Sequence, residues 1–296
     1  MKNIIVLLAV VFVISFEACV PKSIDIDVKP ADPELSVASI VLGNNGIVVS
    51  LTRSYSPLQR PLESDSSSAD TLSDDLLAQI LVANATVTLS YGAQVDTLIE
   101  ISPGIYTNLL TTITEGETYT LRAVDHDMNL SVWAVTTMQT PAQMDTVYPH
   151  ISRTAADTIV YFKYKMLDNV NTVDFYVVNF VKKVQGDTTF DINSVFAAGS
   201  NEVLTEFELY DDQAFENGVL DRDIAILSAG QTDTVAVSVS KITQGYYEFL
   251  TALKRSSSIF NQLTGEPITY PSNVDGGHGY FTMHRTESFI YDLNLY

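Results

Sequence analysis

The chain has 296 residues with 36 acidic and 16 basic side chains, so its formal net charge is -20. This charge repels a phosphate backbone and argues against nucleic-acid binding. Hydrophobic residues make up 46% of the chain and aromatic residues 10%, which is enough to build a core and excludes a disordered acidic tail. A single cysteine rules out an internal disulfide, so stability depends on packing.

The chain opens with "MKNIIVLLAVVFVISFEAC", in which Lys2 precedes an apolar run over residues 4–16. This is the layout of a secretory signal peptide. The run is about a dozen residues long, too short to cross the roughly 30 Å of a bilayer's hydrocarbon core. We therefore expect residues 1–18 to be a signal peptide and not a permanent membrane span.

Cys19 follows the small residue Ala18, as in a bacterial lipoprotein signal, whereas simple secretion fits poorly because Phe16 is bulky. Phe16 and Glu17 depart from the usual lipobox. We expect acyl chains such as palmitate on Cys19, and residues 19–33 as a lipidated tether. Each buried methylene contributes about 0.8 kcal/mol, so several chains hold a protein on a membrane. The alternative is a buried or incidental free thiol.

Residues 34–140 contain short segments in which apolar and polar residues alternate with period two, separated by turn residues such as Asn44–Gly46 and Gly92. A Ser- and Asp-rich insertion at Ser64–Asp75 precedes a short helical pattern at 74–82. This block predicts an immunoglobulin-like or fibronectin-like β-sandwich. The expected strands are "LSVASIVL", "IVVSLTRS", "ATVTLSY", "VDTLIEI", "TYTLRAV" and "LSVWAVTTM".

The segment Gln139–Pro149 holds two prolines, and we place a domain boundary there, with a second β-rich domain over 141–296. One helix interrupts its strands. Thr243 is the expected N-cap, and Lys254 suits the negative end of the helix dipole. The apolar stripe of this helix comprises Tyr246, Phe249, Leu250 and Leu253. The expected strands are "DTIVYFKYKML", "VDFYVVNFVKKV", "TEFELY", "DIAILSA", "DTVAVSVSKI" and "SFIYDLNLY". The predicted fold is mainly β, with one packed helix.

The segment "DHDMN" places Asp125, Asp127 and Asn129 at the alternate spacing that opens a calcium-binding loop. Such a loop has glycine at its sixth position and glutamate at its twelfth, where this chain has Leu130 and Thr136. We therefore expect a solvated hairpin turn.

The segment "DGGHGYF" at Asp275–Phe281 lacks the third glycine and following helix of a dinucleotide fingerprint, so we expect a tight glycine turn. His278 and His284 lie six residues apart and would share a face if the residues between them formed one continuous strand. Zinc takes three or four protein ligands, and no others are evident, so exposed histidines are expected and no metal or cofactor is predicted.

Asp211, Asp212 and Glu216 offer paired carboxylates for glycoside cleavage, but in so acidic a chain a strand-ending turn is the better interpretation. Neither a Gly-x-Ser-x-Gly elbow nor a His-Glu-x-x-His pair occurs. We expect no enzyme. A binding function remains possible for the chain, because Trp133 and 15 tyrosines offer aromatic surfaces for sugars or a protein partner. Most of the tyrosines are nevertheless expected in the cores.

Several motifs together resemble the Bacteroidota lipoprotein family called domain of unknown function 4249: "IDIDV", "SPGIYTN", "ELYDDQAFENG", "ITQGYYEFLTALKRS" and "YPSNVDGGHGYF". The resemblance covers nearly the whole chain from Cys19 onward. It implies an outer-membrane lipoprotein of uncharacterised role, and it transfers only Cys19 as a functional position.

We therefore expect a protein held by its N-terminal lipid on the periplasmic or the cell-surface face of the outer membrane. The expected function is an accessory or binding subunit beside a TonB-dependent β-barrel receptor in nutrient uptake. The alternatives are a free-standing glycan- or ligand-binding surface lipoprotein, and a purely structural component of the cell surface.

Overall fold

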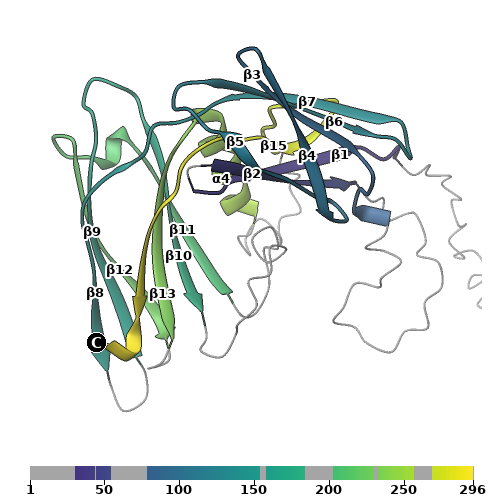
Figure 1. Cartoon of the computed structure of the whole chain (residues 1–296). Coiled ribbons are helices and arrows are strands. Elements are labelled where there is room, and N and C mark those ends of the chain that lie inside the picture. Colours follow the sequence, from purple (N-terminus) through teal and green to yellow (C-terminus); the bar gives the residue numbers. More distant parts are fainter. Residues whose placement is uncertain are drawn as a thin grey trace, which may run out of the picture. The chain divides into compact units, whose positions relative to one another are not determined.

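The computed structural model describes residues 31–43, 45–54, 79–153, 158–183, 203–229, 233–256 and 269–295 (Figure 1). All described residues from Pro33 onward belong to one compact unit. Cys19, the predicted signal peptide and most of the predicted tether and helix before Val82 lie outside the described residues. The predicted fold class is confirmed, because the described elements are mainly β-strands. No helix in this part of the chain has the length and apolarity needed to cross a membrane.

Nine strands form one continuous hydrogen-bonded order, β14-β7-β6-β3-β4-β5-β2-β1-β15. Within it β4 changes partner, because Val87 of β3 lies opposite Leu98, whereas Ile99 lies opposite Thr107 of β5. The order therefore bends into two layers. The strands are β1 (Leu35–Val41), β2 (Asn45–Arg53), β3 (Thr86–Tyr91), β4 (Gln94–Ser102), β5 (Ile105–Thr112), β6 (Thr118–Asp125), β7 (Leu130–Thr137), β14 (Val274–Asp275) and β15 (Gly277–Tyr280).

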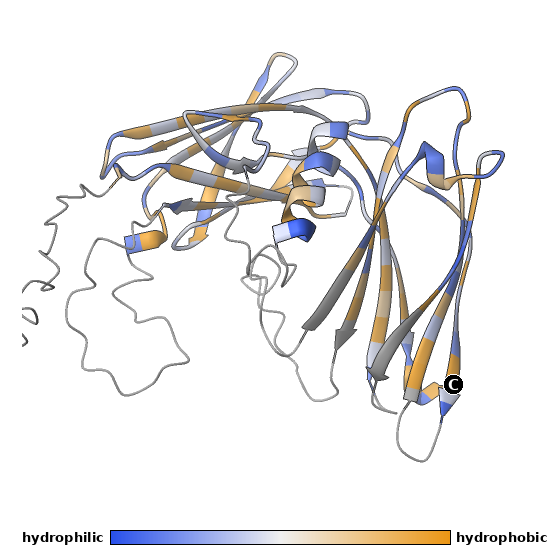
Figure 2. Cartoon of the chain, turned by 180° about the vertical axis from the view of Figure 1, so that it is seen from behind, coloured by the Kyte–Doolittle hydropathy of each residue, from blue (hydrophilic) through white to orange (hydrophobic). Residues whose placement is uncertain are grey.

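Strands such as β1 and β6 alternate between more buried and more exposed residues, as predicted, and Figure 2 shows apolar and polar residues interspersed along the strands. Apolar side chains on one face of each strand are removed from water, which stabilises the fold by roughly 25 cal/mol per Å². The core contains Leu35, Val37, Ile47, Leu51, Val87, Leu89, Tyr119, Leu121, Val132, Met138, Phe281 and Met283.

The segment Val274–Tyr280, named the clasp below, joins the two ends of the nine-strand order. Its β14 part pairs antiparallel with β7, and its β15 part pairs parallel with β1. Gly276 has φ +80, and a Cβ on Gly277 would collide with the carbonyl oxygen of Leu35. Just beyond the clasp, the Thr282 N–H donates to Ser39 Oγ at 2.9 Å. The predicted glycine turn is confirmed.

A second pair of sheets shares one aromatic core. Phe162 packs against Phe180 with ring centroids 6.2 Å apart, and the hydroxyls of Tyr164 and Tyr210 are hydrogen-bonded at 2.6 Å. One sheet has the order β11-β10-β13-β16 and the other β12-β9-β8. The strands are β8 (Gln143–Arg153), β9 (Thr158–Leu167), β10 (Phe175–Lys183), β11 (Val203–Asp211), β12 (Val219–Ala229), β13 (Thr234–Ile242) and β16 (Glu287–Asp292).

Strand β8 occupies most of the segment in which the sequence predicts a domain boundary. It pairs with β9 and forms an outer edge of its sheet. Pro149 is tolerated there because a proline on an edge strand can turn its nitrogen, which has no hydrogen to donate, away from the neighbouring strand. The separation into domains 34–140 and 141–296 stays a prediction, while the pairing of β14 and β15 with β7 and β1 crosses that boundary.

Helix α4 (Gln244–Ser256) begins where predicted, and Thr243 Oγ1 accepts a hydrogen bond from the Tyr246 N–H at 3.3 Å. Its buried Leu250 packs against Val177 of β10 and Ile242 of β13. The predicted stripe is shorter at its C-terminal end, because Leu253 is 36% exposed.

Candidate functional site

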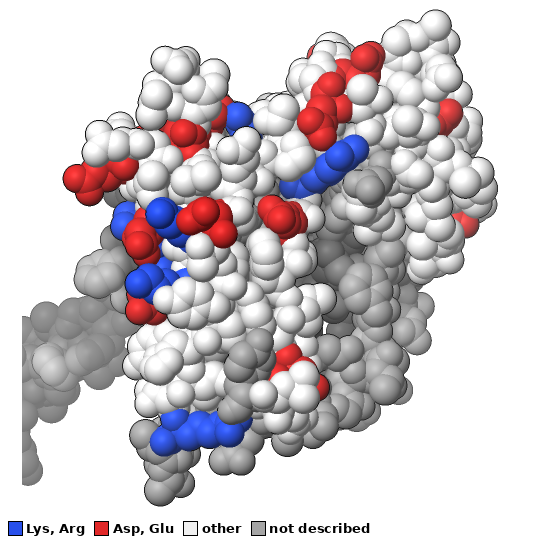
Figure 3. Space-filling view, turned by 60° about the vertical axis from the view of Figure 1, so that its left-hand side comes forward, with Lys and Arg blue, Asp and Glu red and all other residues white. Residues whose placement is uncertain are grey.

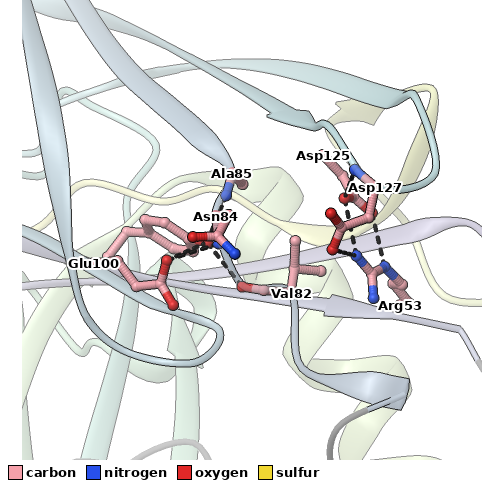
Figure 4. Close-up of polar contacts among 8 residues, drawn as sticks. Arg53, Val82, Asn84, Ala85, Glu100, Asp125 and Asp127 are labelled. Atoms are coloured by element: carbon pink, nitrogen blue, oxygen red, sulfur yellow. Dashed lines mark hydrogen bonds and ion pairs between the residues drawn. The ribbon is translucent and has the colours of Figure 1, made fainter.

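Arg53 and Asp125 form a buried two-point ion pair at the start of the "DHDMN" segment (Figure 4). Arg53 Nε donates to Asp125 Oδ2 at 2.7 Å, and Nη2 donates to Oδ1 at 2.9 Å. Asp127 adds a longer contact with Nη2 at 3.3 Å. Asn129 adopts φ +54 in the β6–β7 turn, so the predicted hairpin is confirmed, but its expected solvation is wrong for Asp125, which is fully buried. Both carboxylates face an arginine.

The ion pair also changes the pKa values of its members. Burial acts to raise the pKa of Asp125, but hydrogen bonds from Arg53 and from backbone N–H groups outweigh it, so this pKa is lowered. The pKa of Arg53 is raised, chiefly by its hydrogen bond to Asp125. The sequence analysis missed Arg53. The sequence did contain an indication of this role. Arg53 lies two residues after the buried Leu51, so its side chain points to the same, buried face of β2, and a buried arginine needs an acidic partner.

A second polar cluster surrounds Tyr106, as the same close-up shows (Figure 4). The Tyr106 hydroxyl donates to the Val82 carbonyl at 2.8 Å and accepts from the Ala85 N–H at 3.0 Å. Glu100 Oε2 accepts from the Asn84 N–H at 2.7 Å. Burial raises the pKa of Tyr106. These groups satisfy the backbone of the segment that enters β3, which is a structural role.

The acidic segment after β11 forms the predicted turn. A short 3-10 helix, η2 (Asp212–Ala214), begins there, and Asp211 Oδ1 accepts from the Gln213 N–H at 3.1 Å. Asp212 Oδ1 accepts from the Asp174 N–H at 2.8 Å, which ties the turn to the segment before β10. These two carboxylates bind backbone groups, as predicted for a strand-ending turn.

His278 and His284 have different environments. His278 is exposed and pairs with Glu34. His284 is partly buried, its ring stacks on Tyr246 at a centroid distance of 5.7 Å, and burial lowers its pKa to about 4. Over the described residues, no three His, Cys, Asp or Glu side chains gather closely enough to hold a metal ion.

Most aromatic side chains fill the cores, as expected, and Tyr106, Tyr119, Tyr164, Tyr176, Tyr210 and Tyr280 are all buried. Trp133 differs, because half of its side chain is exposed on β7. An indole exposed on a regular strand offers a flat apolar face to a ligand.

Strands β4 and β5 carry an exposed apolar surface, named the β4–β5 patch: Val95, Ile99, Ile101, Leu109 and Leu110. Leu110 is 90% exposed and Ile99 70%. Beside them lies an open hollow of about 560 Å³, lined in part by Tyr91, Asp96 and Asn108. Asp96 Oδ2 accepts from the Tyr91 hydroxyl at 2.9 Å, and burial together with this contact raises the pKa of Tyr91 to about 12.

Charged side chains do not cover the surface evenly. On the face drawn in Figure 3 they gather in small groups, with wide uncharged areas between them. Uncharged surface of this kind is available for contacts that a uniformly acidic shell would not permit.

Comparison with known proteins bears on the family and not on the activity. No curated protein matches the chain in sequence. A family model described as "Domain of unknown function (DUF4249)" matches residues 22–289, which is most of the chain and includes both strand-rich parts and the clasp. The chain therefore belongs to the DUF4249 family.

Proposed function

We propose that the protein is an outer-membrane lipoprotein, anchored through Cys19, that acts without catalysis as an accessory or binding subunit of a TonB-dependent receptor. The nutrient receptor is a β-barrel in the same membrane. The lipid confines both proteins to one surface, so even a weak contact between them is occupied, because tethering raises the effective concentration.

The observation that carries this proposal is the β4–β5 patch. Its exposed side chains are all aliphatic and belong to two neighbouring, hydrogen-bonded strands. Val95 and Ile99 lie four residues apart in β4, an even number, so they project on the same side of the strand. Exposed aliphatic residues that gather on neighbouring strands mark an interaction site, since leaving them in water forgoes roughly 25 cal/mol per Å².

A receptor complex would also explain why the surface is strongly acidic in composition yet leaves apolar residues uncovered. Charge keeps the free protein soluble and apart from other copies of itself. The apolar patch then supplies the contact energy when the correct partner is present, and a polar rim around it contributes orientation.

The test is affinity purification of the full chain after gentle detergent extraction of the envelope. We expect a β-barrel receptor to co-purify in stoichiometric amounts, and the double variant Ile99→Lys/Leu110→Lys to lose at least tenfold of it. The matched control is Val170→Lys/Val173→Lys, which charges two equally exposed aliphatic residues at 69% and 75% exposure outside the patch. Absence of a stoichiometric partner, or equal recovery with both double variants, refutes the proposal.

The anchor has a separate test. Cys19→Ala removes the thiol that would be acylated, so we expect the variant to leave the membrane fraction while its circular dichroism spectrum stays unchanged. If this variant sediments with envelopes as the wild type does, the anchoring part of the proposal is wrong.

A further inference from the structure

Trp133 is the only tryptophan of the chain, and it lies between two charged residues on neighbouring strands. Arg122 of β6 is its direct partner on one side, and Asp275 of β14 is its direct partner on the other. Directly opposed residues of antiparallel strands point to the same face of a sheet. Trp133, Arg122 and Asp275 are all exposed, so the three form one row on the outer face.

The row has the dimensions of a small-ligand site. Neighbouring strands lie about 4.8 Å apart, so the two charged residues flank the indole across roughly 10 Å. Neither the Arg122 guanidinium nor the Asp275 carboxylate has a hydrogen-bonding or ionic partner among the residues that the structure describes. The Arg122 guanidinium can thus donate hydrogen bonds to a ligand on one side of the Trp133 indole, and the Asp275 carboxylate can accept them on the other.

We propose that this row binds the sugar ring of a neutral saccharide. The C–H face of a pyranose would stack on Trp133, while its edge hydroxyls accept hydrogen bonds from Arg122 and donate them to Asp275. Charge-assisted hydrogen bonds of this kind are about twice as strong as neutral ones.

Other ligand classes fit the row less well. A phosphate-bearing ligand would be attracted by Arg122 but repelled by Asp275 and by the net charge of -20. A quaternary ammonium is bound within a cage of several aromatic rings. Here a single indole lies on an open strand face. Of the ligand classes considered, a flat, uncharged, hydroxyl-rich molecule therefore fits the row best.

The clasp makes the row rigid. Asn273 Nδ2 donates to the carbonyl oxygens of Val135 at 3.3 Å and of Phe281 at 2.7 Å, which fixes the start of β14 beside β7. Because β7 is paired on both sides, Trp133 and Arg122 lie on regular strands, and Asp275 is held beside them in the two-residue strand β14. Little ordering entropy is then lost when a ligand binds.

The single tryptophan makes the test specific, since intrinsic emission reports on Trp133 alone. The full chain in a detergent without a sugar headgroup is titrated with cellohexaose, maltohexaose and mannohexaose. We expect a saturable emission change with at least one of them, and at least tenfold weaker binding by Arg122→Ala and by Asp275→Asn. Lys163→Ala and Asp223→Asn remove the same charges from exposed positions on other strands and should bind as the wild type does.

No saturable change with any of the three sugars, or unchanged affinity in Arg122→Ala and Asp275→Asn, overturns the inference. The result is independent of receptor docking, because the β4–β5 patch shares no residue with this row. Ile99→Lys/Leu110→Lys should therefore lose the receptor and keep the sugar titration, and either proposal can fail without the other.

Discussion

Arg53 holds Asp125 through two hydrogen bonds, of 2.7 and 2.9 Å, across 72 residues of sequence. Arg53 ends β2 and Asp125 ends β6, so the pair connects strands from the two layers of the nine-strand order. The side chain of Arg53 is 8% exposed and that of Asp125 0%. An ion pair this well buried is costly to break, because removing Arg53 leaves the buried Asp125 carboxylate without a compensating charge.

We therefore expect Arg53→Met to lower the free energy of unfolding by about 3–5 kcal/mol at pH 7, measured by urea denaturation. The exposed pair of Lys165 and Asp145, at 3.6 Å, is the control. Asp145→Asn should cost less than about 1 kcal/mol. A cost for Arg53→Met no larger than that of the control would contradict a structural role for the buried pair.

His284 should make stability depend on pH. Its pKa is lowered from 6.5 to about 4 by burial, so the unfolded chain takes up a proton that the folded chain refuses. Stability is full above pH 6.5 and declines by at most about 3 kcal/mol as pH falls to 4. The lowered pKa of Asp125 adds a loss only at still lower pH, below its ordinary value of 3.8.

His284→Gln should flatten the decline between pH 6.5 and 4, as followed by denaturation at several pH values. His150→Gln, which removes an exposed imidazole, is the matched control, and the decline should persist in it. Identical slopes for the wild type and His284→Gln would show that another group is responsible.

Gly279 should resist substitution for two separable reasons. It has φ +91, and a Cβ there would collide with the Val37 backbone. Gly116 has φ +75 with no atom within 4 Å of such a Cβ, so Gly116→Ala measures backbone strain alone. We expect Gly279→Ala to cost at least about 2 kcal/mol more than Gly116→Ala in thermal unfolding, because β15 must leave β1 to relieve the overlap. Equal costs would mean that the clasp tolerates displacement.

The hydroxyl pair of Tyr164 and Tyr210 should show coupling in a double-mutant cycle. Each single change to phenylalanine leaves a buried hydroxyl without its tyrosine partner and should cost about 1–2 kcal/mol. The double variant should cost less than the sum of the two, since both polar groups are gone. Strict additivity, measured by urea denaturation, would show that the 2.6 Å hydrogen bond contributes nothing.

The sequence predicted the strands where side chains alternate cleanly, because burial on one face imposes period two. Strand β6 follows this rule and agrees with its expected range to one residue. Strand β5 was not predicted, since Ile105, Tyr106 and Thr107 are buried in succession and the alternation is lost. Strand β8 was not predicted because Pro149 argues against a strand. A proline is tolerated in β8 because this strand lies at the edge of its sheet.

The candidate sites depended on partners that local patterns do not reveal. "DHDMN" was predicted as a hairpin turn, yet nothing near it in sequence indicates Arg53. Trp133 was recognised as a possible platform, but Asp275 reaches it only through strand pairing over more than a hundred residues. Non-local strand pairing is set by the whole chain, so the row around Trp133 requires the structure.

The clasp also sets the order in which the nine-strand sheet can be completed during synthesis. Strands β1 and β7 are synthesised before Val274–Tyr280, and their outer edges stay open until this segment is available to pair with them. Unpaired strand edges can form hydrogen bonds with strands of other chains. A chain that has not yet acquired the clasp therefore exposes two unpaired strand edges, at which aggregation can begin.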